Sequence, residues 1–132
     1  MATEYRDAQT LDWSSDNGTV RGTKVISWAG LDGDDKGEWA EVGDYSDRTV
    51  QGVGTFDSAS LAWEGSNDPR CITDPTNASA FPLVNASGGA AIALTAATQG
   101  NQVLQNPRFV RPSNSGGGGS TSLTAYMFCK KG

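Results

Sequence analysis

The 132-residue sequence contains no histidine, and this absence excludes several kinds of catalytic site. Histidine is the commonest general base and metal ligand, and it is essential to Ser-His-Asp and Cys-His arrangements. The two cysteines, Cys71 and Cys129, are too few for a disulfide framework. We therefore expect a protein that is not an enzyme, with no catalytic residues, no metal site and no cofactor.

Basic residues and long apolar runs are also scarce. Ten Lys and Arg stand against 15 Asp and Glu, which gives a net charge of −5. Phosphate binding needs a basic surface, so we expect no nucleic-acid partner. No run approaches the about 18 apolar residues of a membrane helix, and residues 1–13 lack the apolar core of a secretory signal. We therefore expect no membrane partner, a cytoplasmic origin and two buried free thiols.

The acidic residues are unevenly distributed. All 15 lie at or before Asp74, whereas the chain from residue 75 onward has four basic residues and no acidic one. The densest part runs from Asp32 to Asp47, and it is interpreted either as a solvated loop with an exposed strand face or as a surface that meets the basic part of a neighbouring copy. Asp34 and Asp35 are the candidate contact residues there. A cation site is a third reading, although the carboxylate spacing does not match a helix-flanked calcium loop.

Alternation of apolar and polar residues predicts strands along most of the chain. It is cleanest at residues 59–66, and further strands are expected at residues 20–28, 38–42, 48–56, 81–84, 92–95, 103–110 and 121–129. The last of these has apolar residues on both faces, so we expect it to be covered on both. With 17 glycines and 5 prolines between the runs, the pattern predicts an all-β fold. We expect one antiparallel β-sandwich or jelly-roll domain over residues 1–132, with an N-terminal arm at about residues 1–18.

The four tryptophans fall into two groups. Trp28 and Trp63 lie on the apolar faces of predicted strands, and we expect them in the core. Trp13 and Trp39 lie among polar residues, and they are candidates for a protein–protein contact because tryptophan is favoured at binding hot spots. Partial packing under loops is the alternative for this second pair.

Two segments near the C-terminus carry special residues. Prolines bracket Arg108 and Arg111 within residues 106–112, and because proline cannot donate to a ladder the segment is predicted to be an edge strand. The alternation places these arginines on opposite faces, so they do not form one anion site. Residues 113–120, SNSGGGGS, are similar to a flexible linker and predict either a mobile hairpin tip or a loop that becomes ordered against a partner.

Five motifs follow one another in a distinctive order: Gly54-Thr55-Phe56, Ser60 to Asp68, Thr73-Asp74-Pro75, Asn106 to Pro112, and, after the glycine-rich segment, Ser122 to Tyr126. In this order, residues 48–128 resemble small virion structural proteins of tailed bacteriophages, of the head-decoration or cement type. The resemblance implies a β-sandwich that binds the outside of a capsid, often as a trimer, with no catalytic residues. Its implied partner is the major capsid protein, and its implied location is the virion surface after assembly in the host cytoplasm.

Two alternatives stay open beside this resemblance. One is another virion part built on the same fold, such as a tail or neck component. The other is a carbohydrate-binding β-sandwich module, because residues 108–111 also resemble a strand of discoidin-like, galactose-binding jelly rolls. In that case an exposed tryptophan would stack on a sugar face.

Overall fold

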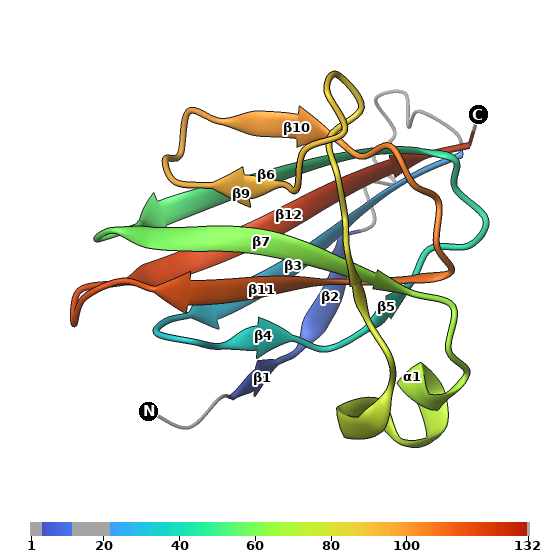
Figure 1. Ribbon diagram of the computed structural model, residues 1–132, viewed down its shortest axis with the longest axis horizontal. Coiled ribbons are helices and arrows are strands. Elements are labelled where there is room, and N and C mark those ends of the chain that lie inside the picture. The colour runs from blue at the N-terminus through green and yellow to red at the C-terminus, as the bar shows by residue number, and fades with distance from the viewer. Residues whose placement is uncertain (1–3, 12–21, 132) are drawn as a thin grey trace.

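The computed structural model describes residues 4–11 and 22–131, and almost all of its regular structure is β-strand (Figure 1). Two sheets pack face to face, so the predicted all-β sandwich is confirmed. The first sheet has the strand order β1-β4-β11-β7-β8, with β5 also paired to β11 and β9 to β7. The second has the order β10-β6-β12-β3-β2. All pairings between these strands are antiparallel except that of β1 with β4.

The strands of the first sheet are β1 (Tyr5–Arg6), β4 (Lys36–Gly37), β5 (Ala40–Glu41), β7 (Ala59–Ser66), β8 (Phe81–Pro82), β9 (Ala93–Leu94) and β11 (Phe109–Gly116). Those of the second are β2 (Ala8–Leu11), β3 (Thr23–Leu31), β6 (Asp47–Thr55), β10 (Gly100–Gln102) and β12 (Ser122–Lys130). A short helix α1 (Arg70–Thr73) and a 3-10 turn η1 (Pro75–Asn77) lie between β7 and β8. Residues 5–11, within the expected arm, supply an edge strand to each sheet.

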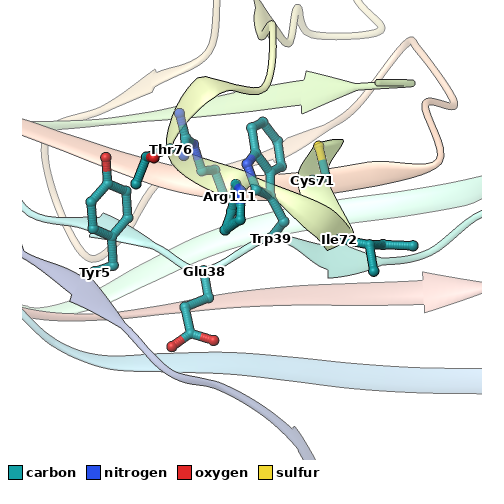
Figure 2. A pocket seen from close by; sticks show the side chains of 8 residues that line it. Tyr5, Glu38, Trp39, Cys71, Ile72, Thr76 and Arg111 are labelled. Atoms are coloured by element: carbon teal, nitrogen blue, oxygen red, sulfur yellow. The ribbon is translucent and has the colours of Figure 1, made fainter. Parts of the chain in front are cut away.

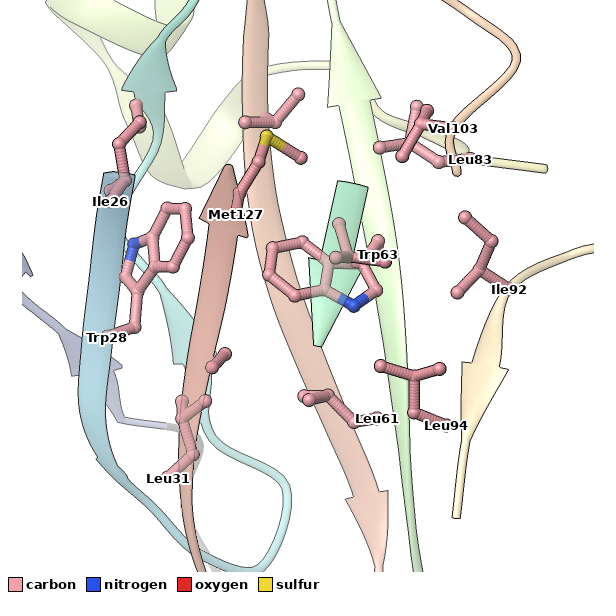
Figure 3. Close-up of a cluster of buried hydrophobic side chains, with 14 of the residues drawn as sticks. Ile26, Trp28, Leu31, Leu61, Trp63, Leu83, Ile92, Leu94, Val103 and Met127 are labelled. Carbon is pink, nitrogen blue, oxygen red and sulfur yellow. The ribbon is translucent and has the colours of Figure 1, made fainter. Parts of the chain in front are cut away.

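The core between the sheets is centred on two tryptophans. Trp28 on β3 and Trp63 on β7 come from opposite sheets, and their rings meet edge to face with centroids 5.6 Å apart. Both are at most 1% exposed, as the sequence predicts. Figure 3 shows aliphatic side chains around them, including Ile26, Leu61 and Met127. Aromatic pairs in this geometry add stabilisation beyond the area that they bury.

The predicted edge strand is wrong, because β11 lies inside the first sheet between β7 and the β4–β5 side. The strand also begins later than predicted, because within residues 103–108 only Val103 takes part in β pairing, as an isolated bridge to Asn85. The backbone N–H of Asn114 donates to Asp35 on the β4 side. The nitrogen of Pro112, two residues earlier, therefore faces the same side. On that side the ladder pairs Ser113 with Lys36 and resumes only at Val110 with Ala40. Pro112 falls in this gap, against Gly37, so a proline fits in an interior strand.

The predicted hairpin tip at residues 113–120 is also wrong. Residues 113–116 belong to β11, and the glycines that follow connect β11 to β12, which lie in different sheets. The backbone N–H groups of Gly118 and Ser120 donate to the backbone oxygen and the carboxylate of Asp57, at 2.9 and 3.1 Å. A Cβ on Gly118 would collide with that carboxylate. The glycine run is thus held against a turn of its own chain.

The outer face of β12 is only partly covered, contrary to expectation. Tyr126 is half-buried and Phe128 is 41% exposed. An antiparallel sheet tolerates water on one face, so a strand with apolar residues on both sides need not be enclosed.

We predict that Trp63→Ala lowers the free energy of unfolding by roughly 3–5 kcal/mol, the usual cost of removing a large aromatic side chain from a core. Urea unfolding followed by circular dichroism measures the loss. Phe128→Ala is the control, and it should cost about 1 kcal/mol at most because its ring is partly in water. Equal losses for the two variants would contradict the assignment of Trp63 to the core.

Candidate binding cleft

A cleft of about 430 Å³ opens beside α1. Its lining comes from β1, from the segment that joins β4 to β5, from α1 and η1, and from β11: Tyr5, Glu38, Trp39, Cys71, Ile72, Pro75, Thr76 and Arg111. Val110 belongs to the core, and successive side chains of a strand point to opposite faces. Arg111 therefore projects from the outer face of the first sheet, and the cleft lies on that face.

The guanidinium of Arg111 lies between two aromatic rings (Figure 2). Its Cζ is 4.2 Å from the centroid of the Trp39 ring and 5.9 Å from that of Tyr5. Its Nε donates to Glu64 Oε1 at 2.8 Å, and Lys36 Nζ reaches the same oxygen at 3.2 Å. Glu64 is the cross-strand neighbour of Arg111. Two cations thus share one carboxylate, which leaves local positive charge beside the cleft.

Trp39 reaches the cleft because two hydrogen bonds fix the backbone of its neighbour Glu38. The indole N–H of Trp28 donates to the carbonyl of Glu38 at 2.9 Å, and the backbone N–H of Glu38 donates to the carbonyl of Arg6. The chain therefore leaves β11 at this point and places the Trp39 side chain against Arg111. Trp39 is half-buried. Its assignment as a partner contact stays a prediction, and partial packing is what the structure shows.

The rim of the cleft is partly apolar and partly acidic. Ile72 is 60% exposed and Tyr5 is 43% exposed. Glu38 is exposed, and a hydrogen bond with the carboxyl of Asp7 raises its pKa, with burial and the charge of Asp7 adding to the effect. The cleft thus offers a cation, two aromatic rings and an aliphatic wall to one ligand.

Asp35 does not lie on a surface, contrary to the sequence-based expectation. Its side chain is 4% exposed and forms an ion pair with Arg6, with 3.0 Å between Oδ2 and Nη2. It also accepts the backbone N–H groups of Glu4 and Asp32. Burial alone would raise the pKa of Asp35, but the hydrogen bonds from Asp32, Arg6 and Glu4 outweigh it and hold the pKa below its usual range. Asp35 anchors the N-terminal segment.

Asp34 and Arg108 lie apart from the cleft lining. Asp34 is exposed and accepts the backbone N–H of Gly116 at 3.3 Å. Trp13 lies outside the described residues. Arg108 is exposed and its Nε pairs with Glu41 at 3.2 Å, away from the pairing of Arg111 with Glu64. The two arginines thus pair with different carboxylates.

Within residues 4–11 and 22–131, no three acidic or cysteine side chains gather as metal ligands would. In the same part of the chain, no helix has the length and apolarity required to cross a membrane.

No protein-family model matches this sequence, and no curated protein is significantly similar to it. Among solved structures, the chain is similar to the IMPa metallopeptidase in complex with T-antigen, with 10% sequence identity and a TM-score of 0.40. The match covers 83% of this chain and 12% of that one. A similarity of this size carries no argument for a shared activity.

We predict that Asp35→Asn destabilises the protein by about 2 kcal/mol at neutral pH, because hydrogen bonds to a buried charge are lost. The difference should shrink on acidification. As the pH falls through about 4, the unfolded carboxyl binds a proton before the folded one, whose pKa is lowered. The wild type therefore loses this contribution as the pH falls through the folded pKa, and the variant has none to lose.

Urea unfolding between neutral pH and the acid range tests this sign. Asp34→Asn is the control and should stay within about 0.5 kcal/mol of the wild type, since Asp34 is exposed. A wild-type to Asp35→Asn difference that grows on acidification would contradict the assignment.

We predict that two free thiols per chain react in urea, and that Cys129 does not react in the folded protein. Both cysteines are free and buried, which confirms that expectation for the structure. Burial raises the pKa of Cys129 to about 11, so little thiolate is present near neutral pH. Alkylation with iodoacetamide followed by peptide mass spectrometry measures both sites. Labelling of Cys129 as fast in buffer as in urea would show that its site opens readily.

Proposed function

We propose that this protein is a capsid decoration protein that binds the outer surface of a bacteriophage head and stabilises it. The support begins with the order of motifs across residues 48–128, which resembles such proteins, and with the sandwich fold that this resemblance implies. In the proposal the partner is the major capsid protein, the copies form a homo-oligomer, with a trimer favoured, and assembly onto the virion takes place in the host cytoplasm.

The observation that carries the proposal is the exposed apolar rim of the cleft. The described residues include four exposed large apolar side chains, and two of them, Tyr5 and Ile72, line this one cleft. Exposed apolar residues gathered at a concave site are typical of a surface that a partner covers. A shell presents its subunits in many copies, so modest contacts at each cleft add up when several copies are joined.

A carbohydrate-binding module is the second candidate, and the pair of aromatic rings in the cleft favours it. However, the guanidinium of Arg111 lies 4.2 Å from the centre of the Trp39 ring, so one face of that ring is already occupied. A tail or neck component, the other alternative, would use the same cleft against a different part of the particle.

We predict that Ile72→Glu weakens capsid binding at least about tenfold, the loss typical of a residue that contributes more than about 1.4 kcal/mol to an interface. Leu104→Glu is the matched control, because Leu104 is 55% exposed but does not line the cleft. Both substitutions place a charge on a surface, so neither should unfold the chain. Co-sedimentation with purified heads that lack this protein measures binding.

The same sedimentation assay separates the alternatives. If the Ile72→Glu variant binds heads as tightly as the wild type does, the cleft is not the surface that binds the capsid. Binding to purified tails rather than heads would favour a tail or neck component. Retention on a polysaccharide matrix, without binding to either particle, would favour the carbohydrate module.

A further inference from the structure

We propose that the cleft recognises a carboxylate carried on an apolar stem, in the form of a partner peptide whose carboxylate contacts Arg111 and whose apolar side chain lies against Ile72. This deepens the proposed function, and it rests on that function only for the identity of the protein that carries the peptide.

Arg111 has donors that its own chain does not use. Its side chain is only 8% exposed, and within the described part of the chain its one hydrogen bond runs from Nε to Glu64. The two terminal nitrogens, Nη1 and Nη2, have no partner there, yet neither is sealed inside the protein. They therefore open onto the cleft that Arg111 lines. A guanidinium so placed is suited to bind an anion.

The surroundings hold the guanidinium in one plane. Trp39 and Tyr5 lie on either side of it (Figure 2), and its Nε is fixed by Glu64. Its free edge can then donate two parallel hydrogen bonds to the two oxygens of a carboxylate, an arrangement that lysine cannot reproduce. Because Lys36 shares Glu64, that carboxylate does not fully neutralise the pair of cations.

The remaining walls select among anions. Ile72 and Pro75 provide an aliphatic surface, which suits an apolar side chain better than the hydroxyls of a sugar. Glu38 at the rim adds negative charge, which disfavours a doubly charged phosphate more than a single carboxylate. Thr76 supplies one hydroxyl for a peptide group. A carboxylate beside an aliphatic side chain fits this combination.

A pair of small probes tests the inference on the wild-type protein. N-acetylleucine carries a carboxylate, and N-acetylleucinamide is its neutral match. Ligands of this size bind with dissociation constants of about 1 mM. In an NMR titration, the acid should shift the indole N–H resonance of Trp39 and bind at least about tenfold more tightly than the amide, the difference expected for a charge-assisted pair. The indoles of Trp28 and Trp63, which are in the core, should not move.

Several outcomes would overturn the inference. One is equal binding of the acid and the amide, and another is no shift of Trp39 at concentrations well above the millimolar range. A third is a response to glucuronic acid but not to N-acetylleucine, which would assign the site to an acidic sugar.

Two variants identify the residues. Arg111→Lys keeps the charge beside Glu64 but loses the planar fork, so it should lose most of the preference for the acid over the amide. Ile72→Ala removes an exposed side chain, and it should weaken both probes to a similar extent with the preference retained. If Arg111→Lys fails to fold, the Ile72→Ala result and the wild-type comparison still decide the outcome.

The failure of this inference and that of the proposed function are distinguishable. Loss of capsid binding in Ile72→Glu, with no preference for the acid probe, would leave the decoration function standing without this chemistry. A clear preference for the acid, with no binding to heads, would leave the carboxylate site standing on a protein of another function.

Discussion

The edge-to-face contact between Trp28 and Trp63 is the constraint on which the rest of the structure depends. It joins the two sheets at the centre of the sandwich, and two such large side chains leave no space beside them. Gly37 shows the consequence, because a Cβ there would lie 2.5 Å from the Trp28 ring and 2.6 Å from Pro112. Residue 37 must therefore be glycine, because β4 lies directly against the Trp28 ring there.

The same contact builds the cleft on the outer face. The indole N–H of Trp28 holds the carbonyl of Glu38, so that the next residue, Trp39, is placed against Arg111. On β7, Trp63 points into the core while the following residue, Glu64, points outward and pairs with Arg111. One strand therefore supplies the core aromatic and the counter-ion of the candidate site, and a change at the core would be felt in the cleft.

Much of the fold could be predicted from local patterns, whereas the site could not. Residues 59–66 alternate cleanly and form β7 with the expected bounds. For β11 the sequence predicts strand residues that begin and end too early, because Pro112 and Gly116 are typical of loops. Only the interrupted pairing between Lys36 and Ala40 makes a proline acceptable there. The sequence predicts Asp35 as a surface charge, because it lies in an acidic run. Its burial depends instead on the ion pair with Arg6, which is 29 positions away. Such non-local partners leave no periodic signal in the sequence.

The fold pairs part of the unevenly distributed charge within one chain. Arg108 and Arg111, two of the four cations after residue 74, pair with Glu41 and Glu64 from the acidic part of the same chain. These cations are therefore already paired within one copy, which leaves less charge to attract a neighbouring copy. Exposed pairs such as that of Arg108 with Glu41 contribute only about 0–1 kcal/mol. Among the described residues, the cleft offers a partner an apolar rim with unused guanidinium nitrogens beside it. A partner that offers one negative group next to one apolar side chain would match both at once, and this requirement is stricter than charge complementarity alone.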